Sequence, residues 1–252
     1  MNTVRLLGLD FVDMNVLQAA AHLTARDRGA PFAAVITPNA DHLVRLHRQP
    51  ELRPVYAAAA YRLLDSRIVA AVARTLRLPT PSVCPGSDLT AELLAQHLAP
   101  GERLTIIGLR PEYLPALCAR LNLAPPAHYD PPMGFWRDQV ALAQAVAFAC
   151  ANPSRFTILA VGSPGQEILA HAIARIGKAT GIGLCVGASL EFLAGAQRRA
   201  PGWMQHAGLE WLHRLARNPR RLAARYLRDD PLIFALLARE RLSRSAAAPE
   251  WR

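Results

Sequence analysis

The chain of 252 residues is long enough for one sizeable α/β domain, or for one domain with a small appendage, that buries its core without metal or disulfide support. Its formal net charge of +10 comes almost entirely from arginine, whose guanidinium group binds oxyanions through paired hydrogen bonds. We therefore expect an anionic partner. Nucleic acid, anionic lipid and a diphosphate-bearing substrate all fit this charge, and a GC-rich gene would also raise the arginine content.

The four cysteines are widely separated, with no CxxC pair and no histidine at ligand spacing: Cys84, Cys118, Cys150 and Cys185. We expect buried free thiols, and neither a zinc site nor a disulfide framework. Residues 1–17 contain Arg5, Asp10 and Asp13 and so do not resemble a signal peptide. The longest apolar stretch, residues 140–150, is too short to span a bilayer, so we expect a cytoplasmic chain that does not cross the membrane.

Short runs rich in Val, Ile and Leu alternate with longer segments of helical period. We expect strands at residues 4–7, 33–36, 61–64, 104–107, 156–161 and 182–186, with helices between them. This alternation is typical of a mostly parallel sheet covered by helices. The predicted fold class is therefore α/β, with a Rossmann-like core over residues 1–196.

Small or polar residues directly follow most of these expected strands. They are residues 37–39, 65–66, 108, 162–165 and 187–189. Ligands of open parallel sheets bind beyond the carboxyl ends of the strands, so we expect these segments to converge on one site. Glycine and proline also terminate ordinary strand-to-helix turns, which is the simpler interpretation of any single segment.

Thr-Pro-Asn-Ala-Asp-His at residues 37–42 opens a helix just after the second expected strand. Its exposed N–H groups could bind an anion, although Asn or Asp here could equally be an ordinary N-cap. Asp65, at the end of the next strand, is the leading general-base candidate, because a carboxylate emerging there from apolar surroundings can accept a substrate proton. The alternative is that Asp65 only caps the helix beginning near Arg67.

The loop Gly-Ser-Pro-Gly-Gln-Glu at residues 162–167 departs from the dinucleotide fingerprint and lacks the P-loop lysine, so NAD and ATP chemistry are disfavoured. Gln166 and Glu167 could instead hydrogen-bond a ribose, a base or a sugar hydroxyl. Glu167 could also be only a favourable acidic residue in the first turn of a helix.

The composition changes after Gln197. From residue 198 onward there are twelve arginines and five acidic residues, with no further strand pattern, so we predict a helical basic appendage over residues 197–252. Arginines at helical spacing form a stripe: Arg214, Arg217, Arg221, Arg225 and Arg228. Pro219 is expected to start a second helix. With Trp203 and Trp211 nearby, this face suits a peripheral membrane contact, and a solvated helix face is the alternative.

Taken together, several segments resemble the WecG/TagA/CpsF glycosyltransferase family from about Leu6 to Glu240. They are residues 37–44, 61–66, 85–89, 131–135, 161–167, 186–195, 199–203 and 208–211. The block beginning Val-Gly-Ala-Ser-Leu-Glu-Phe-Leu at residue 186 is the most specific. Two positions depart from the family pattern: Ser66 stands where glycine is customary, and Gly165 stands where lysine or glutamine is customary.

The resemblance implies an inverting, metal-independent transfer of a sugar from a UDP-linked donor to a sugar on polyprenyl diphosphate, in cell-surface or exopolysaccharide biosynthesis. It implies that Asp65 is the general base, with Thr37 and Asn39 positioning substrate and with Gln166 and Glu167 holding the donor. Further implied substrate contacts are Asp41, Ser87, Asp88, Gly108, Phe135, Gly162 and Gly187. No cofactor is implied.

The resemblance also implies that the appendage helps to close the active site and binds the acceptor diphosphate or the membrane through Arg214, Arg217, Arg221 and Arg225. The enzyme would then attach peripherally to the inner face of the cytoplasmic membrane, and it would tend to self-associate. Two alternatives stay open: an inactive scaffold, suggested by Ser66 and Gly165, and a basic nucleic-acid-binding protein, although no nucleic-acid-binding signature is present. The identity of the UDP-sugar is left open as well.

Overall fold

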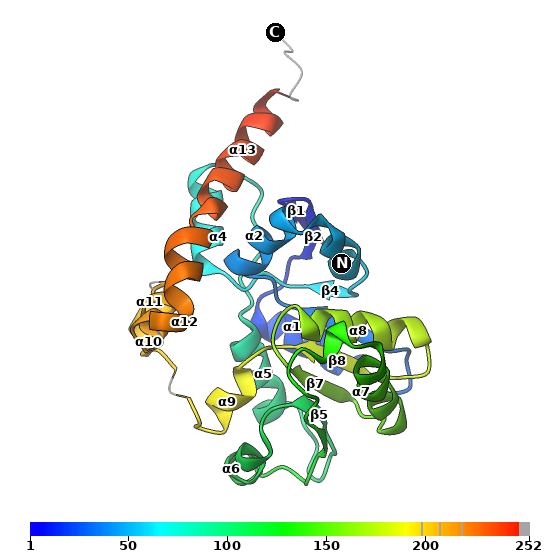
Figure 1. Cartoon of the computed structure of the whole chain (residues 1–252). Helices are drawn as coiled ribbons and strands as arrows, with labels where there is room; N and C mark the ends of the chain where they lie inside the picture. The colour runs from blue at the N-terminus through cyan, green and yellow to red at the C-terminus, as the bar shows by residue number, and fades with distance from the viewer. Residues whose placement is uncertain (198, 207, 218, 247–252) are drawn as a thin grey trace.

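The computed structural model describes residues 1–197, 199–206, 208–217 and 219–246. Its centre is a six-stranded parallel sheet in the order β4-β3-β8-β7-β5-β6. The strands are β3 (Ala33–Ile36), β4 (Tyr61–Arg62), β5 (Thr105–Gly108), β6 (Ala127–Tyr129), β7 (Phe156–Ala160) and β8 (Ile182–Cys185). Helices lie against this sheet, as Figure 1 shows, which confirms the predicted α/β class.

The two faces of the sheet bury two separate apolar clusters. In β3, Ala34 and Ile36 belong to one cluster, whereas Ala33 and Val35 belong to the other, as the alternation of side chains along a strand requires. The first cluster is covered by α2 (Ala40–Arg48), α3 (Arg53–Ala57), α7 (Gln139–Ala151) and α8 (Gly165–Ile176). The second is covered by α1 (Val16–Thr24), α5 (Gly86–Gln96), α6 (Leu114–Leu121) and α9 (Ser189–Leu193).

The strand expected at residues 4–7 is not part of the parallel sheet. It is β1 (Thr3–Leu6), which pairs with β2 (Leu9–Val12) in a separate antiparallel hairpin. The turn places Leu7 and Gly8 at φ values of 50° and 79°, a conformation usually signalled by Asn-Gly, so the hairpin was hard to recognise. β2 and the edge strand β6 were not predicted, and β4 is shorter than expected, with Leu64 forming only an isolated bridge to Val83.

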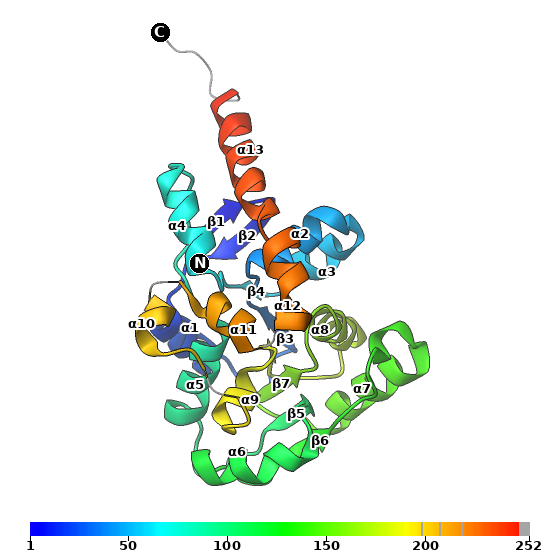
Figure 2. The same ribbon diagram turned by 60° about the vertical axis from the view of Figure 1, so that its left-hand side comes forward.

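The C-terminal part consists of helices joined by short loops, with no strand, where the structure describes it, as the sequence predicts. It contains α10 (Gly202–His206), α11 (Glu210–Arg217), α12 (Pro219–Ala223), a π-helical turn η4 (Ala224–Asp229) and α13 (Leu232–Ala246). Pro219 does begin a helix. α13 packs on α2 and on α4 (Arg67–Thr75), and its far end projects from the body (Figures 1 and 2). Ile233 and Leu237 are buried in the first core cluster, so α13 shares a core with the α/β body.

Single 3₁₀ turns complete the described elements: η1 (Pro50–Leu52), η2 (Pro111–Tyr113) and η3 (Phe135–Arg137). All four cysteines are free, but only Cys84 and Cys185 are buried. The expectation of burial was wrong for Cys118 and Cys150, which lie partly exposed on helix faces. Among the helices in the described ranges, none is long and apolar enough to cross a membrane.

Candidate functional site

A cavity of about 420 Å³ lies between the carboxyl ends of β3 and β4 and the C-terminal helices. The body contributes mainly polar side chains to its wall: Asn39, Asp41, Asp65, Ser66, Arg67 and Ser87. The C-terminal part contributes charged and large apolar side chains: Arg199, Glu210, Trp211, Leu227, Asp230 and Phe234. The volume is typical of sites for small organic ligands, and the combination of an apolar wall and a few convergent polar groups is typical as well.

Asp65 follows β4 and faces this cavity. Its backbone N–H donates to the Pro38 carbonyl at 2.9 Å, and its Oδ2 accepts the backbone N–H of Gly86 at 3.2 Å. The following helix, α4, is capped by Ser66, whose Oγ accepts the N–H of Val69 at 3.2 Å. The capping interpretation of Asp65 is therefore wrong, and the serine that departs from the family pattern has a structural role of its own.

Thr37 does not line the cavity and is 7% exposed. It packs against the start of α5, where a Cβ added to Gly86 would lie 2.6 Å from Thr37 Oγ1. Glycine at this position is therefore what allows Thr37, the Asp65 carboxylate and the α5 N-terminus to come together. The next residue, Ser87, lines the cavity.

We expect Gly86→Ala to lower the free energy of unfolding by about 1–3 kcal/mol, because the new methyl group overpacks this contact. Urea unfolding measures the loss. Thr37→Ala removes the crowded oxygen, so the double variant should lose less stability than the two single losses added together. Strictly additive losses would show that the contact is not crowded.

Asn39 is both a helix cap and a cavity residue. Its Oδ1 accepts the N–H of His42 at 3.3 Å, and its own N–H donates to His42 Nδ1 at 3.1 Å. On the other side of the ring, His42 Nε2 lies 3.5 Å from Glu167 Oε1. Asn39 is thus connected through His42 to a buried carboxylate on α8, so the capping and site interpretations of Asn39 are compatible.

Glu167 and Gln166 are almost fully buried, 3% and 4% exposed, and bond to the protein itself. Gln166 donates through Nε2 to Glu167 Oε1 at 2.8 Å and accepts the Gly187 N–H through Oε1 at 2.9 Å. Burial alone would raise the pKa of Glu167, but the neighbouring His42 and Ser163 side chains and the Gln166 hydrogen bond hold it below the ordinary value.

The strand-end loops are connected to α2 by a second set of polar contacts. Arg45 donates to Ser163 Oγ at 2.6 Å and to Asp41 Oδ2 at 2.5 Å, and the hydroxyl of Tyr56 lies 3.3 Å from the same Ser163 oxygen. Burial raises the pKa of Tyr56 far above its ordinary value, so its hydroxyl stays protonated. Ser163 is therefore held against α2 rather than exposed in the cavity.

The expected convergence of all strand-end segments on one cavity is only partly met. The predicted residues Asn39, Asp41, Asp65 and Ser87 line it, whereas Thr37 does not line it but contacts Gly86, between the lining residues Pro85 and Ser87. The predicted residues Gly108, Phe135, Gly162, Gln166, Glu167 and Gly187 do not line it. Phe135 is 2% exposed and belongs to the apolar core, which accounts for its position. Any donor contact of these residues stays a prediction.

Gly165, the second departure from the family pattern, is explained by packing. A Cβ at this position would lie 2.6 Å from Cε3 of the Trp136 ring. Neither the customary lysine nor glutamine fits beside this ring. The family's lysine or glutamine is therefore replaced here by glycine, which leaves room for the Trp136 ring to pack against the backbone.

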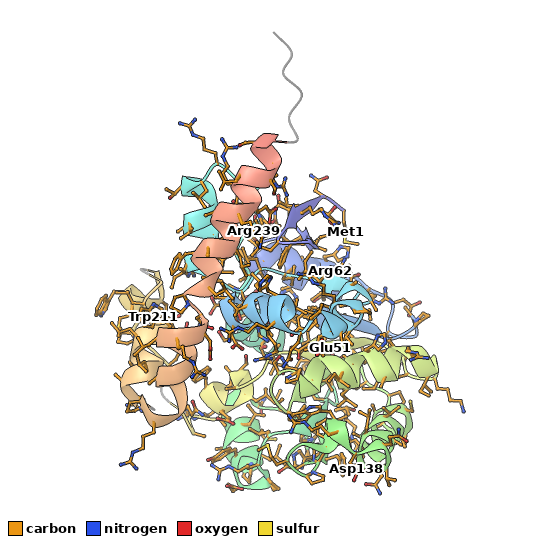
Figure 3. All side chains as sticks on the ribbon, turned by 45° about the horizontal axis from the view of Figure 1, so that its top comes forward. Met1, Glu51, Arg62, Asp138, Trp211 and Arg239 are labelled. Carbon is orange, nitrogen blue, oxygen red and sulfur yellow. The ribbon has the colours of Figure 1, made fainter. Side chains whose placement is uncertain are left out.

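Arg199 connects the body to the C-terminal helices across the cavity. Its guanidinium lies 2.5 Å from Asp88 Oδ1 on α5 and 3.6 Å from Glu210 Oε2 on α11. Asp88, a predicted substrate contact, is thus paired with a cavity cation. Trp211, labelled in Figure 3, lines the cavity, whereas Trp203 is 67% exposed. Arg217 is exposed, and the predicted side chains of Arg214, Arg221 and Arg225 lie outside the described residues.

One comparison with known proteins decides the family. A family model described as the Glycosyl transferase WecG/TagA/CpsF family matches residues 4–247. The chain belongs to this family. It is therefore a glycosyltransferase of cell-surface polysaccharide biosynthesis and acts on a sugar donor and an acceptor. The match covers both the α/β body and the C-terminal helices, so both walls of the cavity lie within the family region.

Several residues of this glycosyltransferase were not found from the sequence. Four of them line the cavity: Arg67, Leu227, Asp230 and Phe234. A fifth, His42, is hydrogen-bonded to Asn39. One signal was available: Asp-Asp-Pro at residues 229–231 interrupts an otherwise basic tail just before a helix. In the described ranges, no group of three or more His, Cys, Asp or Glu side chains is arranged to hold a metal ion.

We expect Arg199→Ala in this glycosyltransferase to raise the KM for substrate about tenfold or more, because hydrogen bonds to charged groups contribute about 1.5–3 kcal/mol each and here hold the two cavity walls together. Steady-state kinetics measures the change. Arg110→Ala, which removes a surface pair with Glu112, is the control and should leave KM unchanged. Equal KM values for the two variants would contradict a closing role for Arg199.

Proposed function

We propose that the enzyme transfers a sugar from a UDP-linked donor to a sugar carried on polyprenyl diphosphate, with inversion at the anomeric carbon. The observation that carries the proposal is the position of Asp65 at a strand end, on the wall of a cavity with a polar side and an apolar side. Asp65 accepts the proton of the acceptor hydroxyl while the oxygen attacks the anomeric carbon from the face opposite the nucleotide. The bond from that carbon to the UDP oxygen breaks, and UDP leaves with the electron pair.

The leaving diphosphate gains negative charge, and we propose that arginines rather than a metal ion stabilise it. Arg67 and Arg199 line the cavity, and an oriented guanidinium in a partly desolvated site stabilises a developing anion strongly. Arg214, Arg217, Arg221 and Arg225 are proposed to add positive charge around the acceptor diphosphate. No cofactor is needed for this chemistry.

The C-terminal helices, as residues 197–252, are proposed to close over the donor and to meet the membrane. Trp211, Leu227 and Phe234 make one wall of the cavity apolar, which suits an acceptor whose carrier is a lipid. Trp203, Leu227 and Phe234 are also 67%, 65% and 48% exposed, so part of this surface faces outward. We propose peripheral attachment to the inner face of the cytoplasmic membrane. We also propose that the protein self-associates.

The inactive-scaffold alternative weakens with these findings. It was suggested by Ser66 and Gly165, and each has a local explanation that leaves Asp65 in the cavity: Ser66 caps α4, and Gly165 makes room for Trp136. Transfer of labelled sugar to a short-chain polyprenyl diphosphate acceptor tests activity directly. Donor binding without any transfer would favour the inactive-scaffold alternative.

A thermal-shift screen against UDP-sugars tests the donor class. A donor at 100 times its Kd stabilises the folded protein by about 2.7 kcal/mol, which raises the Tm by several degrees in a chain of this size. UDP-N-acetylmannosamine, its uronic acid, UDP-glucuronic acid and UDP-glucose form the donor panel, with ADP-glucose as the control. A shift with ADP-glucose but with no UDP compound would contradict a UDP donor, and binding of oligonucleotides alone would favour the nucleic-acid alternative.

Metal independence has its own test. We expect transfer to continue at an unchanged rate in EDTA, because the proposed charge stabilisation comes from guanidinium groups. The assay compares initial rates with EDTA and with added Mg²⁺ or Mn²⁺. A complete loss in EDTA that a divalent metal restores would overturn this part of the proposal.

A further inference from the structure

A second cavity, of about 440 Å³, lies farther along α13 and takes no part in the chemistry proposed above. We call it the hairpin cleft. It is formed by the β1–β2 turn, by α2 and α3, and by α13. Its lining residues include Leu7, Gly8, His47, Arg53, Arg239 and Arg244. Figure 1 shows the hairpin, α2 and the base of α13 side by side, and Figure 3 labels Arg239 on α13.

The cleft is strongly basic. Arg53, Arg239 and Arg244 line it together with His47, and Glu240 is the acidic residue on its wall. Glu240 is already satisfied within the protein, because its Oε2 accepts the N–H of Leu7 at 2.6 Å and its Oε1 accepts two hydrogen bonds from Arg244, at 2.9 and 2.7 Å. Within the described residues, neither Arg53 nor Arg239 forms an ion pair with a carboxylate. The cleft therefore keeps an excess of positive charge.

Parts of this basic surface are held in place before any ligand arrives. Arg244 also donates to the Arg5 carbonyl at 2.8 Å, which fixes its guanidinium between α13 and β1. Arg53 rests on the hairpin turn so closely that a Cβ on Gly8 would lie 2.8 Å from its Nη1. Arg239 is exposed at the rim. Cations held by their surroundings lose less side-chain entropy on binding, which favours affinity for an anion.

We propose that the hairpin cleft is a phosphate-binding site, separate from the sugar-transfer cavity. The planar forks of Arg53 and Arg239 match the oxygen spacing of a phosphate group, and His47 adds a further donor. The same chemistry would recognise a phospholipid headgroup or a soluble phosphate compound. The same helix carries Phe234 in the first cavity and Arg239 in the second, so a phosphate bound here also steadies α13 against the hairpin.

The test uses the full chain and the double variant Arg53→Gln/Arg239→Gln. Binding of inorganic phosphate and of pyrophosphate is measured by calorimetry at constant ionic strength, because salt screens charge interactions. We expect the wild type to bind and the variant to bind at least about tenfold more weakly, the loss expected for charge-assisted hydrogen bonds. The charge-matched control Arg74→Gln/Arg175→Gln removes exposed arginines elsewhere and should bind like the wild type.

A vesicle arm distinguishes the two sources. Flotation compares vesicles containing phosphatidylglycerol with vesicles of phosphatidylcholine alone. Loss of the phosphatidylglycerol preference in the cleft variant, but not in the control, supports a headgroup ligand. Phosphate binding that depends on the cleft, with equal flotation of both variants, supports a soluble ligand.

Equal phosphate binding and equal flotation by the cleft variant and its control would overturn the proposal, as would a wild type that binds neither phosphate nor anionic vesicles. Arg239→Gln alone changes an exposed side chain and keeps the test valid if the double variant fails to fold. The UDP-induced thermal shift should be unchanged in every cleft variant. A failure of the phosphate-site proposal can therefore be distinguished from a failure of the proposed sugar transfer.

Discussion

Asp65→Asn is expected to reduce sugar transfer by about 100- to 10,000-fold, the range typical of a lost general base, while donor binding persists. Asparagine has the same shape, and its side-chain oxygen can still accept the Gly86 N–H that Asp65 Oδ2 now accepts at 3.2 Å. The start of α5 and the cap of α4 are therefore expected to stay in place. Rapid-quench transfer assays with labelled donor, beside a thermal-shift measurement of donor binding, separate the two effects.

Asp130→Asn is the matched control for this variant. Like Asp65, Asp130 lies just beyond a strand of the parallel sheet, in this case β6 at the far edge, where it is exposed and lies away from the cavity. Its substitution should leave transfer unchanged. An Asp65→Asn enzyme that turns over at the wild-type rate would refute the general-base assignment, and a loss of donor binding equal to the loss of transfer would show a binding role instead.

Glu167→Gln is expected to lower the free energy of unfolding by about 3 kcal/mol, because removing one charged member of a buried, hydrogen-bonded set leaves its partners unsatisfied. Glu167 is 3% exposed, its Oε1 accepts a hydrogen bond from Gln166 Nε2, and His42 Nε2 lies 3.5 Å from the same oxygen. A loss of this size lowers the Tm of a chain this long by roughly 6–12 °C. Urea unfolding at neutral pH measures the stability, and Glu112→Gln, at an exposed surface pair, is the control.

We also expect the stability difference between the wild type and Glu167→Gln to depend on pH. The folded pKa of Glu167 lies below its ordinary value of 4.5, so its contribution to stability is fully present above that pH and is lost as the pH falls toward the folded pKa. The stability difference between wild type and Glu167→Gln should therefore shrink below about pH 4.5. A difference that grows on acidification would show that the buried carboxyl group is protonated in the native state.

Local pattern was sufficient for much of the fold. The apolar runs at residues 33–36, 156–160 and 182–185 are buried on both faces, and such central strands of a parallel sheet are continuous in hydrophobicity and easy to recognise. The edges of the sheet were harder. β6 has only half-buried side chains and so lacks the apolar signal of a central strand, whereas β4 was predicted at residues 61–64 but pairs over only two residues.

Some residues of the candidate site could likewise be predicted from local sequence, and others could not. Asn39 and Asp65 could be named because each lies within a few residues of the end of an expected apolar strand, and strand ends in a parallel sheet share one edge. Gln166 and Glu167 follow a strand as well, but contacts with Gly187 and His42 turn them into the interior. No property of the loop sequence distinguishes a polar side chain that faces a ligand from one that faces another buried polar group.

By itself the sequence determined the α/β class, the helical basic C-terminal part, the family resemblance and the position of Asp65 after a strand. All of these depend on residues close together in the chain. Only the tertiary structure decided that Ser66 rather than Asp65 caps α4, that Glu167 is buried against His42, and that the cavity and the hairpin cleft lie along successive turns of α13. The Ser66 cap is a local contact, but the buried Glu167–His42 contact and the two cavities join residues more than a hundred positions apart. Which distant surfaces meet is set by the packing of the whole core rather than by any local pattern.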